Sequence, residues 1–159
     1  MLRYLVVSDS HNPPTYLQKI AKRYAQEQCT GIIHLGDTVS DARTLQKLTG
    51  VRVEMVAGND FGDMASGEPR LRLMSAEGVR MMLCHGHEYG VKYGYDRLSY
   101  AASEQNVSLA LFGHTHEAFC GYVGDVLLLN PGALKKGRYA ILELENGVAR
   151  PFLKTLLDQ

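Results

Sequence analysis

The sequence predicts an α/β fold, and two observations carry this prediction. In the first third of the chain, short apolar runs alternate with helical apolar patterns in the order strand, helix, strand, helix, strand. These runs look apolar on both faces, which is typical of parallel strands covered by helices. Beyond residue 70 the pattern changes to short strands joined by hairpin turns, so we expect the sheet structure to be mixed.

The elements of the first third follow from apolar spacing and from the residues that begin helices. Residues 2–8 form the first predicted strand. Asn12 is the expected N-cap of the next helix, and Pro13 and Pro14 follow, where missing N–H groups cost little. The buried face of this helix has the spacing i, i+3, i+4, i+7, i+8 and consists of Leu17, Ile20, Ala21, Tyr24 and Ala25. The next elements are a strand at 31–35, a helix at 40–48 and a strand at 51–56.

The remainder of the chain reads mostly as short strands. Glu77-Gly78 separates two of them, at 70–75 and 79–84, as a hairpin turn would. A helix at 94–105 and a strand at 108–112 come next. Gly124-Asp125 and Asn146-Gly147 are good hairpin turns, and the last four strands are expected at 117–123, 126–130, 138–144 and 148–154. The sequence has no repeat and no linker, so we expect one domain over residues 1–159.

The charge balance of the chain argues against two classes of partner. Its 159 residues include 17 Lys plus Arg and 17 Asp plus Glu, which gives a formal net charge of zero. Such a chain has no broad attraction to nucleic acid or to an anionic membrane. We therefore expect neither a nucleic-acid polymer nor a membrane as a partner.

Cysteine usage and the N-terminus indicate a cytoplasmic protein. Cys29, Cys84 and Cys120 are odd in number and form no Cys-x-x-Cys pair, which argues against a disulfide framework and fits a reducing compartment. The apolar run at the N-terminus is too short for a secretion signal. No stretch approaches the roughly 20 apolar residues that a membrane helix needs.

The polar residues of chemical interest lie where predicted strands end. In open α/β sheets, the ligand crevice lies at the carboxyl ends of the strands. Five strand ends should therefore direct carboxylate, amide and imidazole groups to one rim. These residues are Asp9 and His11, Asp37, Asn59, His85 and His87, and His114 and His116.

These residue types suit transition-metal chemistry. Imidazole and carboxylate without thiolate favour Mn, Fe, Zn, Ni or Co over Ca or Mg. Seven good ligands among these eight side chains exceed the needs of one ion, and Asp37 is the central candidate for a carboxylate that bridges two. Two ions about 3.5–4 Å apart can clamp a phosphate and create hydroxide at neutral pH.

Each of these residues alone also has a structural interpretation. An Asp after a strand is usually a helix cap or a turn residue. His34, inside a strand, is more often structural, and Cys84 fits core packing. Asn130-Pro131-Gly132 could be only a loop. The joint pattern favours a functional site, because five of the six histidines fall in the strand-end motifs.

The ordered motifs cover almost the whole chain. They are Asp9-x-His11, Gly36-Asp37, Gly58-Asn59-Asp60, His85-Gly86-His87, Gly113-His114-Thr115-His116 and Asn130-Pro131-Gly132. In this order they resemble the calcineurin-like metallophosphoesterase superfamily and, within it, the small bacterial and archaeal phosphodiesterases of the YfcE type. The resemblance implies a four-layer αββα sandwich of two mixed β-sheets flanked by helices.

The resemblance also implies roles for the matching residues. Asp9, His11, Asp37 and His116 would hold a first divalent ion, and Asp37, Asn59, His85 and His114 a second. A hydroxide between the ions would attack the phosphorus of a small phosphate ester. Manganese is the first expectation for the metal, with iron, zinc, nickel or cobalt as alternatives. His87 would border the ligands or face the substrate, so the catalytic candidates are Asp37, Asn59, His85 and His87.

One departure and two alternative functions stay open. Larger relatives have Gly-Asn-His, whose histidine protonates the leaving group, whereas this chain has Asp60 at that position. Some relatives are non-catalytic scaffolds, as in the retromer coat, but the complete set of ligands favours an enzyme. A nuclease is disfavoured by the neutral charge and the lack of a domain to grip a polymer. A homo-oligomer is also open.

Overall fold

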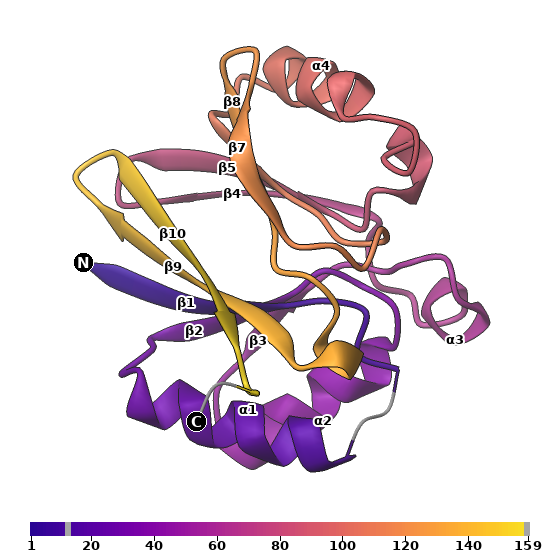
Figure 1. The fold of residues 1–159 in the computed structure, drawn as a ribbon, viewed down its shortest axis with the longest axis vertical. Helices are drawn as coiled ribbons and strands as arrows, with labels where there is room; N and C mark the ends of the chain where they lie inside the picture. The colour runs from indigo at the N-terminus through magenta and orange to yellow at the C-terminus, as the bar shows by residue number, and fades with distance from the viewer. Residues whose placement is uncertain (12–13, 158–159) are drawn as a thin grey trace.

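Two five-stranded β-sheets pack face to face, with helices on their outer sides (Figure 1). The computed structural model describes residues 1–11 and 14–157. The expected N-cap Asn12 and the adjacent Pro13 therefore lie outside the described residues. The order of layers, helices, sheet, sheet and helix, confirms the predicted αββα sandwich.

The first sheet contains the parallel strands predicted from the start of the chain. Its order is β10-β9-β1-β2-β3, in which β1, β2 and β3 are parallel and the hairpin β9–β10 is added antiparallel to β1. The strands are β1 (Leu2–Val7), β2 (Gly31–His34), β3 (Val53–Met55), β9 (Arg138–Glu145) and β10 (Val148–Thr155). The helices α1 (Pro14–Gln26) and α2 (Val39–Thr49) cover its outer face.

The second sheet is also mixed. Its order is β4-β5-β6-β8-β7, with parallel pairs at β5–β6 and β6–β8 and antiparallel pairs at the two edges. The strands are β4 (Leu71–Ala76), β5 (Val79–Cys84), β6 (Leu109–Leu111), β7 (Phe119–Val123) and β8 (Val126–Asn130). The helix α4 (Asp96–Glu104) covers its outer face.

Strand alternation distributes the apolar side chains among three core layers. In β1, Leu5 and Val7 pack toward α1 and α2, whereas Val6 packs between the sheets. Leu98 of α4 belongs to the third layer, outside the second sheet. Side chains of this size each contribute about 1.5–3 kcal/mol when fully buried. The shared inner layer fixes the two sheets relative to each other, and with them the ends of their strands.

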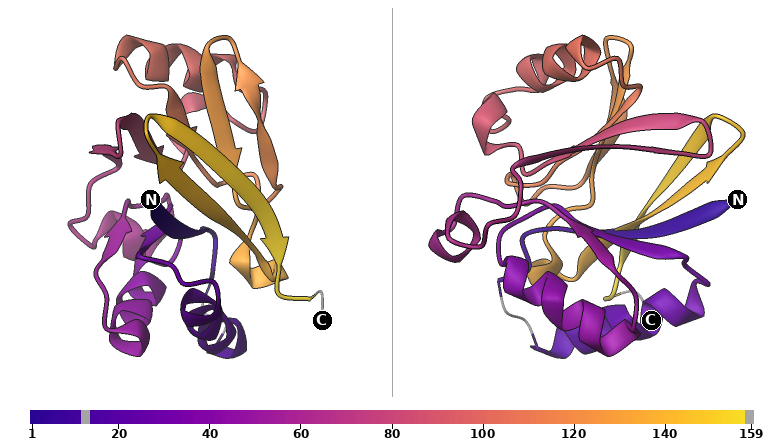
Figure 2. Two further views of the ribbon diagram at one scale, coloured as in Figure 1. Left: turned by 90° about the vertical axis from the view of Figure 1, so that its left-hand side faces the viewer. Right: turned by 180° about the vertical axis from the view of Figure 1, so that it is seen from behind.

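Three short helical segments were not predicted from the sequence. They are α3 (Phe61–Met64) and the 3-10 turns η1 (His87–Tyr89) and η2 (Leu134–Lys136). None is long enough to show an apolar repeat, which is the signal that identifies longer helices. Figure 2 shows α3 beyond the end of the sheets rather than on a sheet face.

Several predicted elements are shorter in the structure than in the sequence-based prediction, and two of them show why. The strand expected at 51–56 pairs only over β3, because the N–H of Ala57 already donates to the carbonyl of Pro69 and the chain turns away. The helix expected from residue 94 begins at Asp96, because Gly94 has a φ of +150° that no helix accepts.

Two expectations from composition can be compared with the structure. The three cysteines are free, with Cys29 and Cys84 buried and Cys120 exposed, so no disulfide framework exists. Burial raises the pKa of the Cys84 thiol to about 12. None of the helices in the described part of the chain is long and apolar enough to cross a membrane.

Candidate metal centre

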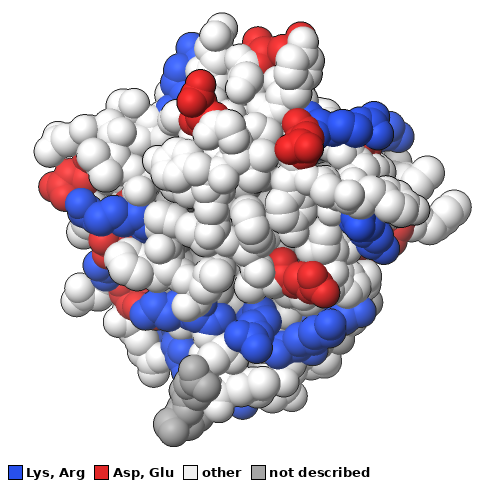
Figure 3. Space-filling model, turned by 45° about the horizontal axis from the view of Figure 1, so that its top comes forward, with Lys and Arg blue, Asp and Glu red and all other residues white. Residues whose placement is uncertain are grey.

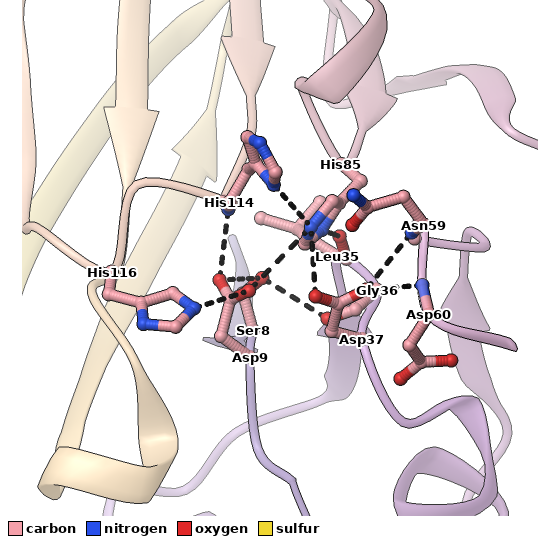
Figure 4. Close-up of polar contacts among 12 residues, drawn as sticks. Ser8, Asp9, Leu35, Gly36, Asp37, Asn59, Asp60, His85, His114 and His116 are labelled. Carbon is pink, nitrogen blue, oxygen red and sulfur yellow. Dashed lines mark hydrogen bonds and ion pairs between the residues drawn. The ribbon is translucent and has the colours of Figure 1, made fainter. Parts of the chain in front are cut away.

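The predicted ligands lie at the ends of strands, and Figure 4 shows those that it labels, Asp9, Asp37, Asn59, His85, His114 and His116, close to one another. They follow β1, β2 and β3 of the first sheet and β5 and β6 of the second. Nε2 of His116 lies 3.3 Å from Oδ1 of Asp9, and Nε2 of His85 lies 3.3 Å from Oδ2 of Asp37. Residues more than 100 positions apart in the sequence are thus brought into contact.

Asp9 has one carboxylate oxygen that nothing in the described chain satisfies. The residue is fully buried, and its Oδ2 accepts hydrogen bonds from Ser8 Oγ at 2.9 Å and from the N–H of His114 at 3.0 Å. Its Oδ1 is buried without a hydrogen bond, although nitrogens of His116 and His85 lie 3.3 and 3.6 Å away. Leaving such an oxygen unpaired is costly, and a cation among these atoms would remove the cost.

Asp37 divides its two oxygens between the backbone and the centre. Oδ1 accepts from the N–H groups of Asn59 at 3.0 Å and Asp60 at 3.3 Å. Oδ2 faces Nε2 of His85 at 3.3 Å and Nε2 of His11 at 4.0 Å. Burial alone would raise the pKa of Asp37, but contact with His85 and the backbone N–H of Asp60 outweigh it, so the pKa is lowered.

His85 is held in the tautomer that a metal ligand needs. Its Nδ1 lies 2.8 Å from the carbonyl oxygen of Leu35, and only an N–H can donate there. Nε2, which carries the lone pair, therefore faces the carboxylates, as in most histidine metal sites. Burial would lower the pKa of His85, but the charges of Asp37 and Asp9 raise it. These carboxylates thus favour positive charge at this position.

His114, His116 and His11 complete the imidazole set. Nδ1 of His114 lies 3.2 Å from Nε2 of His85, and the rings of His11 and His116 are 5.7 Å apart between centroids. Burial, then the charges of His85 and Lys92, lower the pKa of His114 to about 4. Burial likewise lowers the pKa of His116. Neutral imidazole is the form that binds metal ions.

Asn59 and His87 border this group. The exposed Asn59 follows β3, and Figure 4 shows its side-chain amide directed toward His85. The ring of His87, at the start of η1, lies 5.6 Å from that of His85 and 6.1 Å from that of His114. Its Nδ1 is buried and has no hydrogen bond among the described residues.

Left-handed backbone conformations are concentrated at the same place. Ten non-glycine residues of the described chain have positive φ, between 51° and 75°. Among non-glycine residues, Asn, Asp and His adopt this region most often, and such conformations persist where the surroundings enforce them, often at functional sites. Half of the ten are predicted ligands, namely Asp9, His11, Asp37, His114 and His116.

Two glycines allow the ligand loops to touch. A Cβ on Gly58 would overlap Oδ1 of Asp37, and a Cβ on Gly113 would overlap Ser8 Oγ and lie 2.7 Å from Oδ2 of Asp9. Only glycine permits backbone to approach a side chain this closely. The glycines of two motifs therefore have a packing role in addition to their role in turns.

Two residues outside the predicted ligand set orient the ligand loops. Asn130, fully buried, donates from Nδ2 to the carbonyl of Gly113 at 3.2 Å and to Thr115 Oγ1 at 3.0 Å. Its motif was visible in the sequence, where a plain loop was the alternative. The other residue is Asp63, whose carboxylate accepts the N–H groups of Asp37 and Gly58. The sequence motifs did not include it, and its position four residues after Asn59 is the only local signal for it.

Asp60 is turned away from the centre. Its Oδ1 accepts from the N–H of Asp63 at 2.7 Å and its Oδ2 from the N–H of Thr38 at 2.9 Å, so it caps α3. Figure 4 shows its carboxylate pointing away from His85 and His114. In this geometry Asp60 does not stand in for the catalytic histidine of larger relatives.

Among residues 1–11 and 14–157, the His and Asp donor atoms that lie within 4.8 Å of one another form three groups. They are Asp9, His11 and His116; Asp9, Asp37 and His85; and Asp37, Asp60 and Asp63. Two of the groups consist of predicted ligands. The third does not fit a metal, because the carboxylates of Asp60 and Asp63 already accept backbone N–H groups.

Comparison with known proteins identifies the family of the chain. The calcineurin-like phosphoesterase superfamily domain matches residues 2–147. The probable metallophosphoesterase YsnB of Bacillus subtilis is 32% identical over 156 residues, which cover 93% of this chain and 88% of YsnB. A phosphodiesterase of Methanocaldococcus jannaschii is 25% identical over 141 residues, which cover 80% of this chain and 81% of that protein.

The fold also matches solved structures. A variant of Vps29 from Entamoeba histolytica superposes with a TM-score of 0.83, covering 99% of this chain and 94% of that one. At 20% identity this likeness concerns the fold alone. Sequence, fold and the arrangement of carboxylates and imidazoles agree: the chain belongs to the calcineurin-like phosphoesterase superfamily and is a metal-dependent phosphoesterase by family.

Proposed function

We propose that the protein is a dinuclear-metal phosphodiesterase that hydrolyses small phosphate diesters. One observation carries the proposal. Oδ1 of Asp9 has no hydrogen bond, Oδ2 of Asp37 is turned from the backbone, and both face Nε2 of His85 within 3.6 Å. The lone pairs of these carboxylate oxygens and of the imidazole nitrogen face one another with too few N–H protons to pair them. Divalent cations bound there would neutralise the negative charge.

The residues suit two sites that share Asp37. Asp9, His11, Asp37 and His116 would hold one ion, and Asp37, Asn59, His85 and His114 the other. When bound, such ions supply a hydroxide nucleophile at neutral pH and stabilise negative charge on phosphoryl oxygens. Nitrogen and oxygen donors without thiolate suit manganese first in our proposal, with iron, zinc, nickel or cobalt as alternatives.

The chain's own contribution is a fixed arrangement of donors. Backbone N–H groups hold Asp37, and the carbonyl of Leu35 holds His85, so little reorganisation accompanies the reaction. After burial and the charge of His85, the charge of Lys92 contributes to the lowered pKa of His114, and after burial the charge of Lys135 contributes to the lowered pKa of His116. We propose that these positive charges favour an anionic ester.

The test begins with metal-free protein. The chain is stripped with a chelator and reloaded with each candidate metal. Metal content is measured together with hydrolysis of bis(p-nitrophenyl) phosphate and of p-nitrophenyl phosphate. We expect two ions per chain at saturation, loss of activity in chelator, recovery on reloading and preference for the diester. Full activity with one ion or none would contradict the two-metal proposal.

The same assay distinguishes the phosphodiesterase from the two alternative functions, a non-catalytic scaffold and a nuclease. A chain loaded with two ions that turns over no ester would favour the scaffold role. On the face shown in Figure 3, Lys and Arg gather in a band across the lower part, so an anionic polymer also needs testing. A nuclease would cleave single-stranded oligonucleotides faster than small esters, and the rate would fall steeply with salt.

A further inference from the structure

Asp63 is a buried carboxylate whose hydrogen bonds all go to backbone N–H groups of ligand-bearing segments. Its exposed fraction is 2%. Oδ2 accepts from the N–H of Asp37 at 2.8 Å and of Gly58 at 2.7 Å. Oδ1 accepts from the N–H of Thr38 at 3.0 Å and of Val39 at 2.7 Å. With four donors engaged, each oxygen has both lone pairs in use.

One consequence concerns the start of α2. The N–H groups of a helix's first turn need acceptors, and these usually come from the N-cap side chain. Thr38 occupies the N-cap position of α2 but makes no side-chain cap bond. Asp63 supplies the acceptor from α3, 24 residues further along the chain. Its negative charge also suits the positive end of the helix dipole.

A second consequence concerns backbone strain next to the shared ligand. Asp37 and Thr38 are consecutive left-handed residues, with φ of 57° and 75°. For a β-branched residue such as Thr38 this conformation is an outlier that the surroundings must enforce. Asp37 donates its N–H to Asp63, and Thr38 divides its N–H between Asp63 and Asp60. The carboxylate therefore opposes relaxation of the segment that aims Asp37 at the centre.

A third consequence is that Asp63 ties two ligand loops together. Gly58 immediately precedes Asn59, and its N–H shares Oδ2 of Asp63 with the N–H of Asp37. The contact between these loops is too close for a Cβ at Gly58. Across it, Asn59 donates its own N–H to Oδ1 of Asp37. One buried carboxylate thus fixes both sides of this contact.

We propose that Asp63 is a positioning residue that holds the loops of Asp37 and Asn59 in the geometry that binds the metal ions. The inference rests on the proposed metal function. Asp63 does not itself touch an ion, because its oxygens are occupied. It acts through the backbone of the two segments that it joins.

The test compares Asp63→Asn with Ser99→Ala. Asn keeps the size of the side chain, but its amide NH₂ would face the N–H groups of Asp37 and Gly58, or those of Thr38 and Val39. Ser99 is a buried residue of α4 that donates to the carbonyl of Val123, far from the ligand loops in the sequence. Its variant reports loss of a buried hydrogen bond elsewhere in the same fold.

Metal affinity is measured for metal-free wild type and both variants, by calorimetry with Mn²⁺ and by the absorption spectrum of Co²⁺. We expect Asp63→Asn to bind about 10–100-fold more weakly, as for other residues that orient metal ligands, with a changed Co²⁺ spectrum. Ser99→Ala should match wild type in both. Amide exchange at Val39, which donates to Asp63, should accelerate in Asp63→Asn alone, and that at Thr38 less, because Asp60 also accepts its N–H.

The outcomes distinguish the two proposals. If wild type binds no ion, the proposed function fails. If wild type binds ions and folded Asp63→Asn binds them equally well with an unchanged spectrum, the positioning role is wrong. Should Asp63→Asn not fold, Asp63→Glu is measured by the same criteria, because it keeps the charge but displaces it by one methylene.

Discussion

At the scale of single residues, orientation of the side chain matters as much as its identity. Asp37 uses Oδ1 to accept backbone N–H groups and presents Oδ2 to the histidines. Asp37→Asn should therefore disturb both proposed ions while leaving the core unchanged. We expect turnover of a diester to fall about 10²-fold or more, with a far-ultraviolet circular dichroism spectrum like that of wild type.

His34 provides the contrast for that experiment. It is fully buried, its Nδ1 accepts from the N–H of Gly36 at 3.1 Å, and its Nε2 lies 3.0 Å from Ser10 Oγ, to which it donates. Gln can replace part of this pairing, so His34→Gln should reduce turnover far less than Asp37→Asn. Near-normal kinetics in Asp37→Asn would show that the shared-ligand assignment is wrong.

Protonation of the leaving group also depends on the orientation of one residue, Asp60. Asp60 stands where larger relatives have the acid, and both its oxygens already accept backbone N–H groups, Oδ1 from Asp63 in the cap of α3 and Oδ2 from Thr38. General acid catalysis typically contributes about 10²–10⁴-fold. Without it, we expect aryl diesters to react easily and alkyl diesters slowly, so the logarithm of the rate should fall steeply as leaving-group pKa rises.

A series of substituted aryl and alkyl diesters, assayed with one metal at fixed pH, measures this dependence. A flat plot would mean that another residue donates the proton. Asp63→Asn should leave the slope unchanged even where it lowers the rate, because Asp63 has no proposed part in protonating the ester.

The sequence pointed to the proposed ligands more readily than to the residues that hold their loops. Asp9, Asp37 and the paired histidines follow predicted strands, and a strand end specifies a location in an α/β sheet. Asp63 follows no strand. Its role depends on α3 folding back against the start of α2, and four residues carry too little apolar pattern to predict that helix.

At the scale of elements, the pairing of β1 with β9 is the join between the parallel strands and the C-terminal hairpin. Arg3 lies opposite Glu143 in the register, and its Nε donates to Oε2 of Glu143 at 3.1 Å. The hydrogen bond from Arg3 is the main cause that lowers the pKa of Glu143 from 4.5. The pair is partly exposed, so its contribution is modest.

This shift gives the pair a pH dependence with a definite sign. Because the pKa of Glu143 is lower in the folded chain, the stabilisation is complete above the unfolded value of 4.5 and is lost as pH falls through the folded value. Glu143→Gln should lower the melting temperature at pH 7, and the difference should shrink toward pH 3. Glu145→Gln removes a more exposed ion pair, with Arg150, from the same strand and is the comparison, with a smaller expected effect. A constant difference at all pH values would contradict the assignment.

Element boundaries were predictable where apolar periodicity was long. The helix α1 and the hairpins β4–β5 and β9–β10 have the expected positions within a few residues. The strand β3 was overestimated because apolar residues continue past the point where its ladder ends. That ending depends on a bond to Pro69, a contact that local sequence does not specify.

At the scale of the whole molecule, the sandwich is held by an inner apolar layer and by two outer layers under the helices. The arrangement of the two sheets was expected from the resemblance rather than from residue patterns, because periodicity identifies a strand but not its sheet. Nothing in the apolar spacing of β1 or β5 says that they belong to different sheets.

The donors come from both sheets, and this division links ion binding to the cohesion of the molecule. Asp9, Asp37 and Asn59 follow strands of one sheet, whereas His85 and His114 follow strands of the other. An ion bound by both groups would cross-link the two sheets, so its binding free energy would also oppose their separation.

With such a cross-link, the melting temperature of the protein would depend on the metal concentration. A ligand that binds only the folded chain contributes about 2.7 kcal/mol at 100 times its dissociation constant. The melting temperature of the loaded chain should rise with the logarithm of free Mn²⁺ and return to that of the stripped chain in excess chelator. If scanning calorimetry gives the same melting temperature with and without the ion, no metal ion cross-links the two sheets. In that case the two halves of the sandwich are held by their apolar layer alone.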